Sequence, residues 1–294
     1  MSARHPDELV LCLCLEDSAQ CDVVIQGISS GHVFGPSQPL HLMLCGSNTS
    51  DLEGLRMDIE DCTFPLVKGT SVVNSLSGAS VTPHVVMVFL SQREARDHSH
   101  VVQFGQLPRL IDFITDISDI LSSSPALCDQ KVLIVGDLAL TASSLLSRKL
   151  KCLSSSQLLA IDSDEPSAVL GRESRRPKTS QYGLLSRLCT TVSHWWTGPQ
   201  EKRHITINLG TKFLDTKQRS SSSSSSSLPS FSGYFFSTPV DIHSPQSFSM
   251  CLDKSVSIDH IVRCKEEQDR AIRLLASVDD QQREAEGYVI EARL

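Results

Sequence analysis

Aromatic residues are scarce in this chain, since Phe, Tyr and Trp make up only 5% of its 294 residues. Hydrophobic residues of all kinds nevertheless make up 40% of the sequence. A chain of this length and apolar content can bury a sizeable core, as one large domain or two ordinary ones. The composition therefore predicts a globular protein despite the shortage of aromatic side chains.

Basic residues are outnumbered and form no long block. There are 27 Lys and Arg residues against 34 Asp and Glu residues, which gives a formal net charge of −7. The isoelectric point is near 5.8. Proteins that bind nucleic acids usually present a basic patch to the phosphate backbone. We therefore expect no nucleic-acid partner.

Long apolar runs are also absent from the sequence. No segment approaches the roughly 20 apolar residues that a membrane-spanning helix needs. The apolar run nearest the N-terminus, Leu9–Leu15, is short and is bracketed by acidic residues, which does not fit a signal peptide. We expect a soluble, cytoplasmic protein with no membrane partner.

The ten cysteines include no C-x-x-C pair and lie at positions 12, 14, 21, 45, 62, 128, 152, 189, 251 and 264. Several fall inside apolar runs, as in LVLCLCL (Leu9–Leu15), where cysteine behaves as a small hydrophobic residue. The pattern favours reduced thiols in the core of an intracellular protein over a zinc site or a disulfide framework. We expect no metal site.

The first half of the chain alternates short apolar runs with helical patterns. Five runs indicate buried strands: Leu9–Leu15, Leu40–Cys45, Val85–Leu90, Lys131–Val135 and Gln157–Ile161. The first four are rich in Val and Leu without alternation, as in parallel strands covered on both faces. A helical stripe is formed by Leu110, Ile111, Ile114, Ile117 and Leu121. Residues 1–160 therefore predict an α/β fold, a Rossmann-like doubly wound parallel sheet.

The second half, residues 161–294, predicts a reduced α+β domain of catalytic type. Strands are expected at His204–Leu209 and Tyr234–Ile242, and a long helix from Ser257 to about Ala285. The unbroken serine run Ser220–Ser227 can bury nothing. It predicts a disordered insert at about residues 218–230.

The segment LEGLRMDIEDCTFPLVKG, Leu52–Gly69, follows the second predicted strand. Ser50 and Glu53 have the spacing of a helix capping box, and Pro65 ends the helix. One apolar face is formed by Leu52, Leu55, Ile59 and Cys62. The segment is therefore expected to form a short crossover helix between parallel strands.

Two stretches carry a resemblance to a known family: GHVFGPSQPLHLML (Gly31–Leu44) and the segment Leu52–Gly69. Both resemble the corresponding parts of the cytosolic-type NAD-dependent malate dehydrogenases, in the lactate/malate dehydrogenase superfamily. The resemblance implies an NAD cofactor and a malate, 2-hydroxy acid or other small dicarboxylate substrate. It also implies a homodimer, or pairing of this chain with an active relative.

The resemblance assigns a catalytic pair, Asp162 and His194. In the family reaction a His exchanges the hydroxyl proton of the substrate while an Asp orients that His. Read without the resemblance, Asp162 is an ordinary helix-capping acid, and His194 is a loop histidine beside two tryptophans. Both interpretations stay open at this point.

The cofactor-binding positions implied by the resemblance are degraded. Leu15 and Ser18 stand where the family has glycines, and Glu16 and Asp17 lie between them. A side chain there blocks close approach of the backbone, and acidic groups repel a pyrophosphate. Gly46 replaces the acid that binds the adenine ribose. The remaining cofactor-binding candidates are Val135 and Gly136, at the end of a predicted strand.

The substrate-binding positions are altered as well. The arginine-rich loop of the family corresponds to SQREARDH, in which Arg93 is the candidate substrate clamp. Asp137 stands where the family has an asparagine, and Glu165 replaces an arginine. Loss of one desolvated carboxylate–guanidinium pair costs on the order of 3–5 kcal/mol.

Three hypotheses follow from these positions. The first is a divergent malate dehydrogenase homologue with weak or no oxidoreductase activity and a regulatory or interaction role. The second is an active NAD-dependent dehydrogenase that uses the His194/Asp162 pair, with Arg93 as the substrate clamp. The third is an imperfect gene model around the serine run, which would leave an unstable protein.

Overall fold

The computed structural model describes most of the chain in twelve segments. These are residues 6–17, 22–46, 48–76, 81–90, 106–124, 130–154, 157–162, 181–197, 205–213, 233–244, 247–250 and 258–291. The serine run and the predicted disordered insert lie outside them. Within the described segments, no helix is long and apolar enough to cross a membrane.

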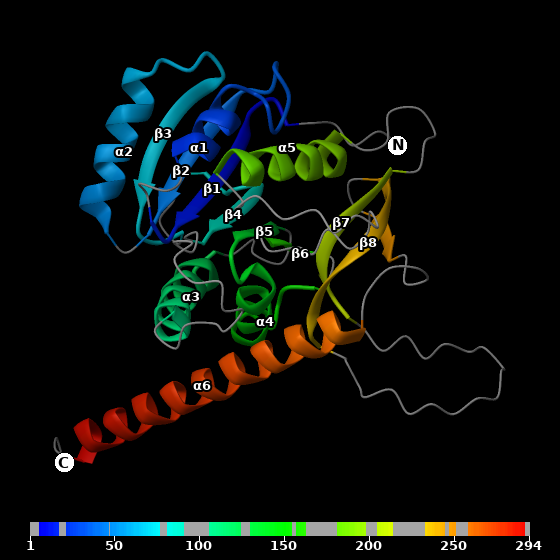
Figure 1. The fold of residues 1–294 in the computed structure, drawn as a ribbon. Coiled ribbons are helices and arrows are strands. Elements are labelled where there is room, and N and C mark those ends of the chain that lie inside the picture. The colour runs from blue at the N-terminus through cyan, green and yellow to red at the C-terminus, as the bar shows by residue number, and fades with distance from the viewer. Residues whose placement is uncertain are drawn as a thin grey trace, which may run out of the picture.

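Six parallel strands form the central part of one sheet (Figure 1). They are β1 (Leu9–Leu15), β2 (Leu40–Cys45), β3 (Val67–Val73), β4 (Val85–Phe89), β5 (Lys131–Gly136) and β6 (Leu158–Asp162). Their order across the sheet is β3-β2-β1-β4-β5-β6. The five strands expected from the apolar runs are confirmed, and so is the doubly wound arrangement.

Of the six parallel strands, the one that the sequence did not reveal is β3, at the edge of the sheet. Its sequence, VKGTSVV, interrupts Val with polar residues, and its side chains are half-buried or exposed. An edge strand pairs on one side only, so it does not need the continuous apolar run that marks a central parallel strand.

Helices cover both faces of this sheet. One face carries α1 (Asp22–Ser29), α2 (Thr49–Asp61) and α5 (Gln181–Thr197). The other carries α3 (Gln106–Ser122), α4 (Ala139–Lys149) and α6 (Ile258–Glu291). The predicted apolar stripe of α3 is confirmed, because all five of its residues from Leu110 to Leu121 are buried.

Three antiparallel strands extend the sheet beyond β6. They are β7 (Ile205–Lys212), β8 (Phe235–Ser244) and β9 (Ser247–Met250). Ala160 of β6 pairs with Gly210 of β7, so the nine strands form a single sheet. A Cβ at Gly210 would lie 2.7 Å from the Cβ of Ala160, so this close junction needs glycine.

The crossover helix α2 differs from the sequence interpretation at its N-terminus. The cap is Asn48, whose side chain accepts a hydrogen bond from the backbone N–H of Asp51 at 3.4 Å. Glu53 instead pairs with Arg56 at 2.6 Å, so the predicted capping box of Ser50 and Glu53 is wrong. The predicted apolar face is correct for Leu52, Leu55 and Ile59, whereas Cys62 is exposed at the C-terminus of the helix.

Candidate functional site

The parallel strands bring most of the predicted site residues to one edge of the sheet. Gly46 follows β2, Val135 and Gly136 end β5, Asp137 follows them, and Asp162 ends β6. Gly136 and Asp162 are register partners in adjacent strands. Ligands of open α/β sheets bind outside the carboxyl ends of the strands, so this carboxyl edge is the candidate site.

The strand order reverses between β1 and β4, which makes the end of β1 the centre of this edge. Leu15 ends β1 and is only 6% exposed. The backbone N–H of Glu16 donates to the carbonyl oxygen of Phe89 in β4 at 3.1 Å, and Asp17 follows. The turn at the switch point therefore begins with a buried Leu and two acids. The next helix, α1, adds Asp22 in its first turn.

Gly46 lies directly beside this turn. A Cβ built on Gly46 would sit 3.3 Å from the carbonyl oxygen of Leu15, tighter than an ordinary contact. Packing against the Leu15 carbonyl therefore favours glycine over a larger residue at position 46. Glycine supplies no carboxylate toward a ribose.

Gly136 also has a structural reason for being glycine. Its φ is +126°, and a Cβ there would lie 2.6 Å from the carbonyl oxygen of Leu90. Residue Leu90 in turn donates its N–H to the carbonyl oxygen of Val135 at 2.9 Å. The close approach of these two chain segments requires glycine whether or not a cofactor binds.

Asp162 lies near Cys264 of α6, beside both acidic and basic side chains. Burial raises the pKa of the Cys264 thiol to about 12, with smaller contributions from the nearby charges of Asp162 and Glu267 and an opposing one from Arg263. The Glu267 carboxylate accepts a hydrogen bond from the hydroxyl of Thr141 at 3.1 Å. Acidic and basic groups therefore both lie near the end of β6, because Arg187 and Arg263 accompany Asp162 and Glu267.

Sequence reasoning missed the role of α5 at this site. The Arg187 guanidinium donates to the backbone carbonyl of Asp162, so the helix begins close to the end of β6. At its other end, the Trp196 ring lies 5.6 Å from the Phe34 ring, centroid to centroid. Phe34 follows α1 and precedes β2, at the amino edge of the sheet.

His194 lies in the last turns of α5, not in the loop that the sequence suggested. It is seven residues after Arg187, or about 10 Å along the helix axis. This position carries its backbone toward the amino edge and away from the end of β6.

Other predicted positions fall outside the described residues. These are Arg93, the candidate substrate clamp, together with Glu165 and Ser18. The apolar spacing of Leu188, Val192 and Trp195, all buried, is the sequence signal that could have identified α5 as a helix.

Solved dehydrogenase structures share this arrangement of strands and helices. No protein-family model matches the chain. A solved malate dehydrogenase from Naegleria fowleri superposes with a TM-score of 0.62 at 13% identity, covering 94% of this chain and 100% of that one. A Trichomonas vaginalis lactate dehydrogenase in complex with NADH and oxamate gives 0.65 at 12% identity, covering 92% and 99%. The chain has the fold of the malate and lactate dehydrogenases.

Curated relatives match this chain over short stretches. The chloroplastic NADP malate dehydrogenase of Mesembryanthemum crystallinum is 47% identical over 47 residues, 15% of this chain and 11% of that enzyme. The Pisum sativum enzyme of the same name is 51% identical over 43 residues, 14% and 10%. The matched segment thus spans about a tenth of these relatives. Both carry NADP in their names, whereas the resemblance described above was to the cytosolic NAD type.

Proposed function

We propose that this chain is a divergent relative of the malate dehydrogenases that has weak or no malate/oxaloacetate oxidoreductase activity. It keeps the dehydrogenase fold and serves as a regulatory or interaction homologue in the cytoplasm. The single observation that carries the proposal is the turn at the end of β1, where Leu15, Glu16 and Asp17 occupy the switch point of the sheet.

A dinucleotide meets two obstacles at this turn. Its pyrophosphate needs backbone N–H groups that it can approach closely, and a side chain at each residue of the turn prevents that approach. Acidic groups at Glu16 and Asp17 add repulsion to the missing contacts. Gly46 also removes a directional contact to the ribose, worth about 1–3 kcal/mol.

The catalytic positions support the same proposal. A proton-transferring His must lie within hydrogen-bond reach of its partner Asp, directly or through one water. The position of His194 in α5, toward the opposite edge of the sheet from Asp162, argues against such a pair.

The alternative is an active NAD-dependent dehydrogenase for malate or another 2-hydroxy acid. It requires the His194/Asp162 pair to form when a ligand binds, and it requires a cationic clamp such as Arg93. For either function, a homodimer or pairing with an active relative is what the resemblance implies.

Titration of the full chain with NADH and NADPH tests the proposal. We expect no change in nicotinamide fluorescence and no rise in melting temperature up to millimolar cofactor, because a ligand that binds only the folded state must stabilise it. Micromolar binding of either cofactor, with oxaloacetate-dependent oxidation that His194→Ala abolishes, would establish the active enzyme instead.

A charge-removal variant tests the physical cause. We expect the double variant Glu16→Gln, Asp17→Asn to bind NADH more tightly than the parent chain. The substitutions remove the repulsion between the two carboxylates and the pyrophosphate and retain the fold. The matched control is Glu60→Gln, an exposed acid in the last turn of α2, at the end of the helix away from the carboxyl edge. If the control and the double variant bind NADH equally, the acidic turn is not the obstacle.

A further inference from the structure

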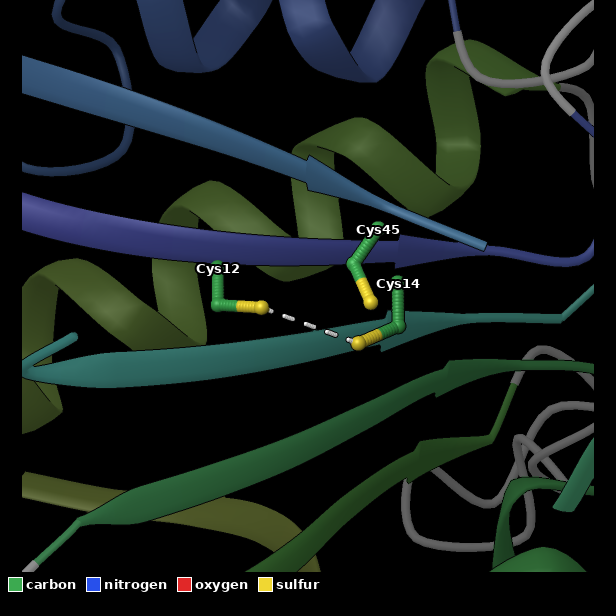
Figure 2. A group of neighbouring side chains, drawn as sticks. All are labelled: Cys12, Cys14 and Cys45. Carbon is green, nitrogen blue, oxygen red and sulfur yellow. Dashed lines mark hydrogen bonds between the residues drawn. The ribbon is translucent and has the colours of Figure 1, made fainter. Parts of the chain in front are cut away.

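Three cysteine thiols that are separated in the sequence converge inside the sheet. Cys12 and Cys14 lie on β1 and Cys45 ends β2. Cys14 and Cys45 are register partners. The three sulfur atoms all lie within 4.8 Å of one another, and those of Cys12 and Cys14 are 3.9 Å apart. Figure 2 shows the three side chains on the same side of the two strands, with their sulfur atoms gathered.

Strand geometry explains why these residues meet. Side chains two residues apart on a strand point to the same face, and register partners on adjacent strands lie side by side. All three thiols are fully buried, on the face covered by α3. They are also close to the carboxyl edge, because Cys45 is the last residue of β2 and Cys14 is the last but one of β1.

We propose that Cys12, Cys14 and Cys45 form a binding site for a soft monovalent metal ion, Cu(I). Three sulfur atoms around one ion, at a metal–sulfur distance of about 2.3 Å, lie roughly 4 Å from one another. The observed separation of Cys12 and Cys14 matches this spacing without rearrangement of the backbone. Within the described residues, this is the group of potential metal ligands that lies close enough together.

The donor set favours Cu(I) over Zn²⁺. Thiolate and thioether sulfur are the donors that select soft ions. Met43 is the register partner of Cys12 and is buried in the same cluster, so a thioether lies near the three thiols. Structural Zn²⁺ almost always takes four N, O or thiolate ligands, and only three thiols are gathered here among the described residues. Val86 and Val88 of the same buried cluster are apolar and offer no ligand atom.

This inference does not rest on the proposed function. The site lies in the interior behind the acidic turn, and it can hold an ion whether or not a dinucleotide binds. Loss of Cu(I) binding would leave the cofactor titration unchanged, and detection of NADH binding would leave the metal site standing. The two proposals therefore fail separately.

The test is anaerobic titration of the reduced full chain with Cu(I) in the presence of a chromophoric Cu(I) chelator. We expect one Cu(I) per chain to resist the competitor. Removing a residue that only supports a metal ligand typically weakens binding by roughly 10–100-fold. Cys14→Ala and Cys45→Ala each remove a ligand itself, so each should weaken Cu(I) binding by more than that. Cys62→Ala and Cys152→Ala, which remove exposed thiols, are the matched controls and should keep the tight ion.

X-ray absorption of the wild-type 1:1 complex provides a readout that does not depend on the folding of any variant. Coordination by sulfur alone supports the site. Nitrogen or oxygen ligands, retention of the tight ion by the variant lacking all three thiols, or a preference for Zn²⁺ over Cu(I) would overturn it. Failure of the wild-type chain to hold Cu(I) against the chelator would overturn it as well.

Discussion

Gly136 illustrates how a residue can look functional and still be required by packing alone. The resemblance to a dehydrogenase marks it as a cofactor position. In the structure, its φ of +126° and its contact with the Leu90 carbonyl make any side chain there unfavourable. A glycine that the fold needs is therefore no evidence that a cofactor binds, and the discriminating residues are Glu16 and Asp17 at the end of β1.

We predict that Gly136→Ala lowers the free energy of unfolding by roughly 2–4 kcal/mol, from backbone strain and overpacking together. The control is Gly54→Ala in α2, where a Cβ meets nothing within 4 Å. That change should raise the free energy of unfolding by up to about 1 kcal/mol, because Ala has the higher helix propensity. Urea denaturation measures both, and equal effects of the two substitutions would contradict the packing argument.

The start of α2 shows that local sequence signals can be ambiguous at the scale of a single element. Two overlapping patterns are present, Ser50 with Glu53 and Asn48 with Asp51, and both have capping-box spacing. The structure uses Asn48, whose side chain also donates to the Asp51 carboxylate at 2.6 Å. The earlier start adds helical residues and leaves Glu53 to pair with Arg56.

At this scale we predict that Asn48→Ala destabilises the protein by about 1 kcal/mol, the usual effect of removing an N-cap. Ser50→Ala should change the free energy of unfolding by less than about 0.5 kcal/mol, because Ser50 is an exposed residue inside the helix. Thermal denaturation of the two variants side by side gives the comparison. A larger loss for Ser50→Ala would restore the cap that the sequence suggested.

At the scale of the whole molecule, the long helix α6 joins the antiparallel strands to the parallel sheet. Gln268 is fully buried, and its side-chain amide accepts from the N–H of Phe235 at 2.9 Å and donates to its carbonyl at 2.7 Å. Further along the helix, Lys149 of α4 and Asp279 form an ion pair at 3.4 Å. Figure 1 shows α6 passing below α3 and α4. The Gln268 side chain thus satisfies both the backbone N–H and the backbone carbonyl of Phe235, the first residue of β8.

We predict that Gln268→Leu lowers the free energy of unfolding by on the order of 2–5 kcal/mol, since it leaves a buried N–H and a buried carbonyl without their partner. Glu266→Gln, an exposed change on the same helix, should stay within about 0.5 kcal/mol of the parent protein. Chemical denaturation followed by circular dichroism measures both. If Gln268→Leu is neutral, α6 does not depend on this hydrogen-bonded pair.

The parallel sheet was predictable because strands buried on both faces must be continuously apolar, as Leu9–Leu15 and Val85–Phe89 are. The stripe of α3 was predictable for the same reason, since burial of one helix face fixes the spacing of its apolar residues. The edge strand β3 and the helical state of the segment around His194 were missed. Strand β3 was missed because pairing at a sheet edge depends on distant residues, whereas α5 carries a local signal in the apolar spacing of Leu188, Val192 and Trp195.

The amino-acid sequence by itself thus determined the layers of this protein and the acidic character of the turn after β1. Whether a residue favours a buried or an exposed position depends mainly on its own side chain, and so does its charge, so both can be read from the sequence. Only the tertiary structure decided which residues meet. It gathered Cys12, Cys14 and Cys45 through strand register, because such contacts depend on how whole elements pack.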